Sequence, residues 1–79
     1  MEYDEDKVDE MVLALLYLTT STDGEGARAW KGHDWDAMDR LYQKGYISDP
    51  QSKAKSVLVT EDGVKRSQEL FREYFVRKL

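Results

Sequence analysis

The sequence contains no cysteine and no long apolar run. The missing thiols exclude disulfide bonds, a thiol nucleophile and thiolate metal ligands. The longest uninterrupted apolar run, residues 11–18, is less than half of the about 20 residues that a membrane span needs. The first residues are acidic instead of basic, which argues against a secretory or mitochondrial signal. These absences predict a small, soluble, cytoplasmic domain that does not associate with membranes.

Basic side chains are also outnumbered. The 79 residues hold 12 Lys and Arg against 16 Asp and Glu, a net charge of −4, which argues against a general nucleic-acid coat protein. The charge is uneven, because residues 1–39 carry a net −8 and residues 40–79 a net +4. Either the charges follow helix ends and solvent faces, or the second half forms a basic patch. The length and the 41% of apolar residues predict one folded domain, residues 1–79.

The apolar spacing of residues 4–19 predicts a first helix, with Asp4 as its N-cap. Five apolar residues recur at spacings of three and four and form one face: Val8, Met11, Val12, Leu15 and Leu18. Leu13, Leu16 and Tyr17 lie off that face, so the helix is apolar nearly all round from residue 11 onward. Such a helix must be covered on two sides, which suggests a partner.

A loop is predicted for residues 19–26 and a short second helix for residues 25–31, with Ala27 and Trp30 facing inward. A third helix is predicted from Asp34 to Lys44, capped by His33 or Asp34 and ended by Gly45. Its apolar stripe is expected to be Trp35, Met38, Leu41 and Tyr42.

The second half of the chain predicts a hairpin followed by a helix. Residues 46–48 and 56–60 have the β-branched and aromatic character of strands, and the polar loop 49–55 joins them. Thr60 is the expected cap of a last helix that runs to about Arg77. The apolar residues of this helix cover more than one stripe: Val64, Leu70, Phe71, Tyr74, Phe75, Val76 and Leu79.

This order of elements resembles a winged helix-turn-helix domain. Residues 41–47, the loop 49–55 and residues 57–63 carry the resemblance. Multiple-antibiotic-resistance-type and phenolic-acid-type repressors show a similar run: Leu-x-x-x-Gly-Leu/Tyr-Ile, a hairpin, and Val-x-Leu-Thr-x-x-Gly. The resemblance implies an α+β winged helix with three helices, a two-stranded β-hairpin wing and a C-terminal helix, and it implies dimers formed through the terminal helices. Residues 28–41 and 44–50 also resemble a family of short uncharacterised bacterial proteins, which implies no activity.

The resemblance places DNA contacts on the third helix and the wing, where the candidates are Arg40, Lys44, Lys53 and Lys55. Lys65 and Arg66 add basic charge further along the chain. Three aspartates on the third helix oppose phosphate contact: Asp34, Asp36 and Asp39. The sequence therefore leaves two partners open, nucleic acid or another protein.

Catalytic chemistry has little support in the sequence. His33, Asp34 and Asp36 could hold a metal, but helix capping explains the same residues. The acidic cluster of residues 4–10 is predicted to be a solvated helix face. No serine motif and no phosphate-binding loop is present. We therefore expect a protein that is not an enzyme, with no catalytic residue, metal, cofactor or small-molecule substrate.

Aromatic and aliphatic residues that one small core cannot all bury are the candidates for protein contact. Trp30 and Trp35 flank the turn before the third helix and either fill the core or anchor a partner. The other candidates lie on the two terminal helices: Leu16, Tyr17, Leu70, Phe71, Tyr74, Phe75 and Val76. This surplus predicts a homodimer in which the first and last helices pack together.

Overall fold

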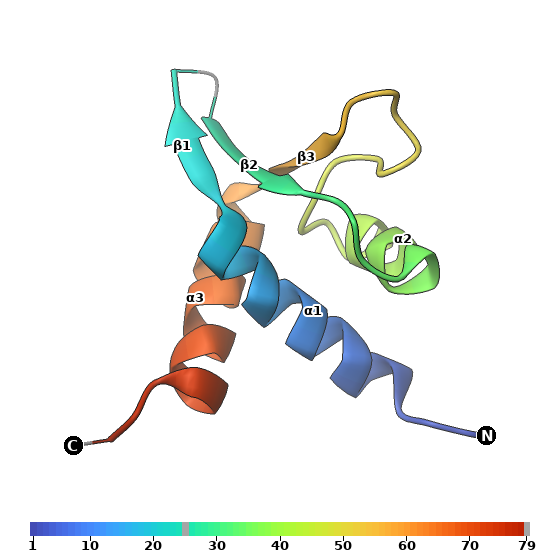
Figure 1. Cartoon of the computed structure of the whole chain (residues 1–79), viewed down its shortest axis with the longest axis vertical. Coiled ribbons are helices and arrows are strands. Elements are labelled where there is room, and N and C mark those ends of the chain that lie inside the picture. The colour runs from blue at the N-terminus through green and yellow to red at the C-terminus, as the bar shows by residue number, and fades with distance from the viewer. Residues whose placement is uncertain (25, 79) are drawn as a thin grey trace.

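The computed structural model describes residues 1–24 and 26–78 and has an α+β fold (Figure 1). Its elements follow in the order α1 Glu5–Thr19, β1 Ser21–Asp23, β2 Gly26–Trp30, α2 Trp35–Gln43, β3 Ser56–Val59 and α3 Glu61–Phe75. The three strands form one antiparallel sheet in the order β1-β2-β3. Helix α1 packs against both α2 and α3, so it is the central element of the helical layer (Figure 1).

Three of the four predicted helix starts are confirmed, because each has an expected side chain as its N-cap. Asp4 accepts from Lys7 N at 3.1 Å, Asp34 accepts from Ala37 N at 3.1 Å, and Thr60 accepts from Gly63 N at 3.0 Å. Each cap satisfies a backbone N–H that the first turn of a helix leaves without a partner. Helix α3 ends at Phe75, two residues before the predicted end, and the prediction for Leu79 lies outside the described residues.

The predicted helix over residues 25–31 is wrong, because residues 26–30 form strand β2. β2 pairs with β1 from Ser21↔Arg28 to Asp23↔Gly26 and with β3 from Ala27↔Val59 to Trp30↔Ser56. The prediction of an unbroken loop from residue 19 to 26 is wrong for the same reason. Two neighbouring strands satisfy the backbone of this segment on both edges, an outcome that local propensity cannot foresee.

The predicted hairpin is confirmed in a reduced form. Ile47 makes an isolated bridge to Val59, Ser48 N donates to Leu58 O at 2.8 Å, and Thr60 N donates to Tyr46 O at 3.0 Å. The main partner of β3 is nevertheless β2. Three helices were expected before this hairpin, which is wrong for the described residues: α1 and α2 precede it, and the β1–β2 hairpin stands between them.

Two glycines make the connection into and out of this region. Gly45 has a φ of 84°, a left-handed conformation that favours glycine, and it ends α2 as predicted. Gly63 lies against the backbone of Tyr46, where an added Cβ would collide with the carbonyl oxygen. α3 can therefore begin directly beside the strand segment at residues 46–48.

The core lies between the sheet and the three helices, and it reverses the expected orientation of α1. The buried apolar residues are Leu13, Ala14, Leu16, Ala29, Ala37, Met38, Leu41, Ile47, Val57, Val59 and Leu70. On α1 the core therefore takes the residues off the predicted face. Leu15 and Leu18, both members of that face, are 42% and 65% exposed. The prediction that α1 has two apolar sides is correct, but the side with the regular spacing is divided: Val12 packs against the core, whereas Leu15 and Leu18 face outward.

Candidate functional site: a pocket between two tryptophans

A pocket of about 260 Å³ opens where β2 turns into α2. One wall is the start of α2, the opposite wall is the loop 49–55, and the end of β2 with the following turn forms its floor. The lining residues are Trp30, Lys31, Gly32, His33, Trp35, Met38, Asp39, Pro50, Gln51 and Lys55. We call this the tryptophan pocket.

Both tryptophans lie at the surface. Trp30 is 56% exposed and Trp35 is 79% exposed, so the alternative that they fill the core, and the inward orientation of Trp30, are wrong. Trp35 was also placed in the apolar stripe of α2, but the buried residues of that helix are Ala37, Met38 and Leu41. Large indole rings left in water are unusual and are enriched where proteins bind partners.

Gly32 holds the Trp30 ring at the floor of the pocket. A Cβ at position 32 would collide with the indole Nε1 of Trp30 and crowd two ring carbons. The absence of a side chain therefore lets the indole lie against the turn. Since the ring sits at the end of a rotatable side chain, an added methyl group would move the ring and leave the backbone in place.

Lys31 fixes the opposite wall. Its Nζ donates to Pro50 O at 2.8 Å and also to Ser52 O, and its backbone N donates to Lys55 O at 3.3 Å. The loop 49–55 is therefore tied to the end of β2 at three points. Because the ammonium group is already occupied by two carbonyl oxygens, Lys31 shapes the pocket and leaves charge recognition to other residues.

The polar groups of the pocket differ from wall to wall. Asp39 on α2 carries negative charge, and its Oδ2 accepts from Gln43 Nε2 at 3.0 Å. Lys55 on the loop wall carries positive charge, and its Nζ has no partner among residues 1–24 and 26–78. The pocket thus presents an apolar centre between an acidic and a basic wall.

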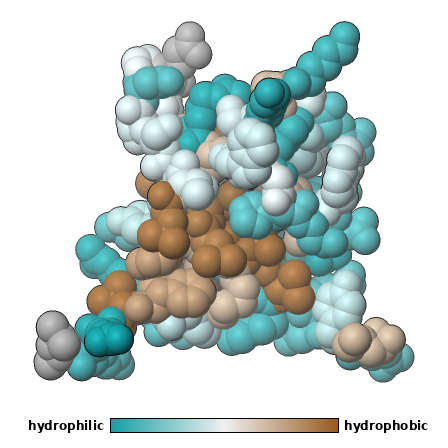
Figure 2. All heavy atoms as spheres, viewed as in Figure 1, coloured by the Kyte–Doolittle hydropathy of each residue, from teal (hydrophilic) through white to brown (hydrophobic). Residues whose placement is uncertain are grey.

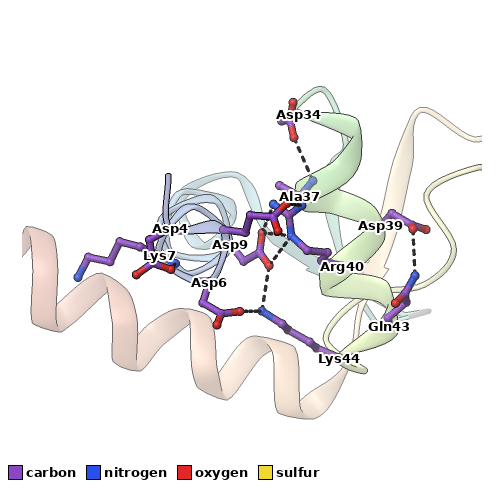
Figure 3. Close-up of polar contacts among 11 residues, drawn as sticks. Asp4, Asp6, Lys7, Asp9, Asp34, Ala37, Asp39, Arg40, Gln43 and Lys44 are labelled. Atoms are coloured by element: carbon purple, nitrogen blue, oxygen red, sulfur yellow. Dashed lines mark hydrogen bonds and ion pairs between the residues drawn. The ribbon is translucent and has the colours of Figure 1, made fainter. Parts of the chain in front are cut away.

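The opposite end of α2 holds a charge cluster around one buried carboxylate (Figure 3). Asp9 of α1 is only 1% exposed, and both of its carboxylate oxygens lie 2.9 Å from Arg40 Nε. Lys44 Nζ donates to the same carboxylate at 2.9 Å. Glu5 and Asp6 complete the cluster, with Glu5 2.8 Å from Arg40 and Asp6 3.3 Å from Lys44.

The electrostatics of the cluster fix its charge state. Burial alone would raise the pKa of Asp9, but the hydrogen bonds from Arg40 and Lys44 outweigh it and hold the pKa below its ordinary value. The hydrogen bond to Asp9 outweighs desolvation in the same way at Arg40 and Lys44 and raises the pKa of both. All three groups are therefore ionised at neutral pH.

This cluster changes the interpretation of the residues expected to contact DNA. Arg40 and Lys44 face α1 and bind the buried Asp9, whereas Lys53 and Lys55 are exposed on the loop 49–55. The prediction that the acidic cluster is wholly solvated is wrong for Asp9. A signal was present in the sequence, because Asp9 lies four and seven residues before Leu13 and Leu16 and shares their side of the helix.

The remaining candidates for protein contact separate into two groups. Leu16 and Leu70 are 0% and 1% exposed, so their assignment to an interaction surface is wrong. The others are at least partly exposed on α1 and at the end of α3: Tyr17, Phe71, Tyr74, Phe75 and Val76. The ring of Phe71 lies 5.1 Å from that of Tyr17 and 5.3 Å from that of Phe75. Tyr74 instead points toward α1, where Lys7 Nζ donates to its hydroxyl at 2.7 Å.

Two further classes of site have no counterpart in the described part of the chain. No three acidic or histidine side chains within residues 1–24 and 26–78 are placed together to bind a metal ion. None of the helices in these ranges is both long and apolar enough to cross a membrane.

Comparison with known proteins gives a family for the chain. It is 52% identical over 77 residues to the uncharacterized protein y4hR of Sinorhizobium fredii (strain NBRC 101917 / NGR234). The alignment covers 98% of this chain and 100% of that protein. No solved structure matches the chain. A family model described as a domain of unknown function, DUF6429, matches residues 4–77. The predicted resemblance to a family of short uncharacterised bacterial proteins is thereby supported, and the chain belongs to the DUF6429 family.

Proposed function

We propose that this chain is a non-catalytic, cytoplasmic protein-binding domain that holds one side chain of a partner protein in the tryptophan pocket. The observation that carries this proposal is the exposure of two indole rings around one pocket, at 56% for Trp30 and 79% for Trp35. Tryptophan supplies more contact area than any other side chain at little cost in conformational entropy, which is why it dominates binding hot spots.

The size of the pocket sets what it takes. Sites for drug-sized ligands and cofactors enclose about 300–1,000 Å³, and this pocket encloses about 260 Å³. It fits a single apolar side chain or ring better than a whole cofactor. The remainder of such a ligand must lie across the open rim, as an extended peptide segment does.

The two walls select the charges of that segment. Asp34, Asp36 and Asp39 lie on the α2 side, and Lys53 and Lys55 lie on the loop side. A segment with a basic residue on one flank of its anchor and an acidic residue on the other would match both walls. The indole N–H groups can donate to its backbone carbonyls, since neither has a hydrogen bond within the described ranges.

Duplex DNA is the second candidate partner. The segment from α2 to α3 keeps the helix, wing-like loop, strand and helix of the winged-helix resemblance, and we propose a winged-helix-like domain in which the β1–β2 hairpin replaces the second helix. Phosphate contact from α2 would require Arg40 and Lys44 to leave a buried carboxylate. Lys53 and Lys55 alone predict weak binding, about 10⁻⁴ M or poorer at physiological salt. The protein-binding proposal is therefore favoured.

We further propose that the chain forms a homodimer through α1 and α3, as the surplus of apolar residues on the terminal helices predicts. Support comes from the side chains that both helices leave in water, above all Leu18 at 65% and Val76 at 52% exposure.

The protein-binding proposal can be tested by selecting a displayed random-peptide library on the wild-type chain. We expect peptides with one large apolar residue between charged flanks and dissociation constants of about 1–100 μM, near −8 kcal/mol at the tighter end. Tryptophan fluorescence reports the binding directly. Trp35→Ser should abolish peptide binding. Leu58→Ser, which alters an exposed residue of β3, is the matched control and should leave peptide binding unchanged.

The same preparation should be titrated with random duplex DNA. Sub-micromolar DNA binding, or selected peptides that bind Trp35→Ser as well as the wild type, would contradict the proposal. In the first case Lys53→Glu with Lys55→Glu tests the wing: a loss of DNA binding places the contact on the wing, and unchanged binding moves it to the last helix at Lys65, Arg66 and Arg72.

A further inference from the structure

The outward face of α1 and the end of α3 together form one apolar surface. Four of its residues are well exposed, with Leu15 at 42%, Leu18 at 65%, Phe75 at 44% and Val76 at 52%. We call these four residues the apolar band. Figure 2 shows apolar atoms running across α1 and the last turns of α3, between the two chain ends. Monomeric proteins seldom leave such a continuous apolar surface in water, and larger ones mark interaction sites.

The sequence pattern of α1 strengthens this interpretation. Val8, Met11, Leu15 and Leu18 follow helical spacing on one side, yet Leu13 and Leu16 fill the core from another side. A helix needs only one apolar side to pack in a monomer. The second side of α1 is regular over three turns, which is the pattern of a surface that packs against another helix.

The charges near the two chain ends have opposite sign. The chain start and the first turn of α1 carry Glu2, Asp4, Glu5 and Asp6 against one basic residue, Lys7. Glu5 and Asp6 already pair with Arg40 and Lys44 within the chain, whereas Glu2 makes no ion pair with another residue of the described ranges. The last turn of α3 and the following residues carry Arg72, Arg77 and Lys78 against one acidic residue, Glu73. In Figure 1 the two chain ends lie on opposite sides of the molecule. The three basic side chains are exposed and make no ion pair with another residue of the described ranges.

We infer that the apolar band is the contact surface for a second copy of this chain, placed by a two-fold axis that lies in the contact plane and crosses the band at right angles. This inference rests on the homodimer proposed above and specifies its surface and orientation. The axis reverses the band, so the acidic start of α1 in one copy lies opposite the basic end of α3 in the other. The charge arrangement therefore favours this antiparallel dimer over a parallel one, which would bring like charges together.

The surface is tested by sedimentation equilibrium on the full chain. The wild type should be a dimer at about 100 μM, and Leu18→Glu should weaken it by about 30-fold, the effect of removing a hot-spot contact of about 2 kcal/mol. Leu58→Glu is the matched control, because Leu58 is exposed on β3 outside the band and should leave dimerisation unchanged. Since Leu18 is 65% exposed, the Leu18→Glu monomer should keep the wild-type circular dichroism.

The orientation is tested by charge reversal. Arg77→Glu with Lys78→Glu should weaken the dimer by about fivefold, as expected for exposed pairs of up to about 1 kcal/mol, and Glu2→Lys added to both should restore it. A monomeric wild type overturns the homodimer and this inference together. A dimer equally sensitive to Leu58→Glu and Leu18→Glu keeps the homodimer and overturns the surface. A dimer that needs Leu18 but is not restored by Glu2→Lys overturns the two-fold arrangement.

Discussion

The two ends of α2 use their side chains in opposite ways. At the C-terminal end, Arg40 and Lys44 are drawn against α1 to neutralise the buried Asp9. At the N-terminal end, Trp35 stands in water beside Asp39 and the tryptophan pocket. Charged groups thus stabilise the fold where solvent is excluded, while apolar groups remain exposed where a partner can reach them. Residue type alone would suggest the reverse, which shows that a site must be inferred from burial and contacts.

The largest effect should come from the buried end. Asp9→Asn removes the carboxylate that Arg40 and Lys44 share, and breaking a buried ion pair from one side costs about 3–5 kcal/mol. We expect a loss near 3 kcal/mol in the free energy of unfolding, because Arg40 and Lys44 retain some solvent contact. Urea denaturation measures it. Asp39→Asn, the control on the exposed end, should change the free energy by less than about 0.5 kcal/mol. Similar losses in both variants would contradict the comparison.

The same cluster should govern the acid limb of stability. Because the folded-state pKa of Asp9 lies below its unfolded value of about 3.9, its stabilisation is complete above that pH and is lost as pH falls through the folded pKa. Lys44 has a raised pKa, so its contribution persists below about pH 10.4 and is lost only as pH rises through the higher folded value. As pH is lowered from 7 to 2, the urea midpoint should fall in the wild type and should change less in Asp9→Asn. An unchanged acid limb in that variant would remove Asp9 as the cause.

The exposed N-terminal end of α2 should tolerate substitution with little loss of stability. Trp35→Ser should change the free energy of unfolding by no more than about 0.5 kcal/mol, since the indole is 79% exposed and leaves no cavity. Thermal unfolding by circular dichroism provides the measurement. A loss of 2 kcal/mol or more would mean that Trp35 supports the fold, and its role in binding would then have to be judged from Trp30 alone.

The subtlest change is Gly32→Ala. The added methyl group collides with the Trp30 indole, so the ring should move while the backbone and the stability remain close to wild type. Near-ultraviolet circular dichroism should record the altered ring environment. Selected peptides should bind about tenfold more weakly, a loss of about 1.4 kcal/mol. Unchanged affinity would indicate that the position of Trp30 does not matter for the pocket.

The local features of the fold were predictable, and the pairings were not. Caps at Asp4, Asp34 and Thr60 follow from side-chain chemistry that acts within three residues. The conversion of residues 26–30 into a strand depends on β3, which lies about 30 residues further along the chain. Of the tryptophan pocket, the sequence predicted only the two Trp residues as a possible contact site. Its opposite wall, the loop 49–55, was not predictable, because hydrogen bonds from Lys31 hold this distant loop beside the end of β2.

The sequence by itself determined where the three helices start, the need for glycine at positions 45 and 63, and the presence of two apolar sides on α1, because these depend on local geometry and spacing. Only the tertiary structure decided which side of α1 is buried and which charges are neutralised. Leu13 and Leu16 pack in the apolar core, and Asp9, on the same side of α1, is buried beside Arg40 and Lys44 of α2, which neutralise its carboxylate. A buried carboxylate is stable only beside its counter-ions. The packing of α1 against α3 and α2, elements distant in the sequence, accompanies the orientation that leaves Leu15 and Leu18 at the surface.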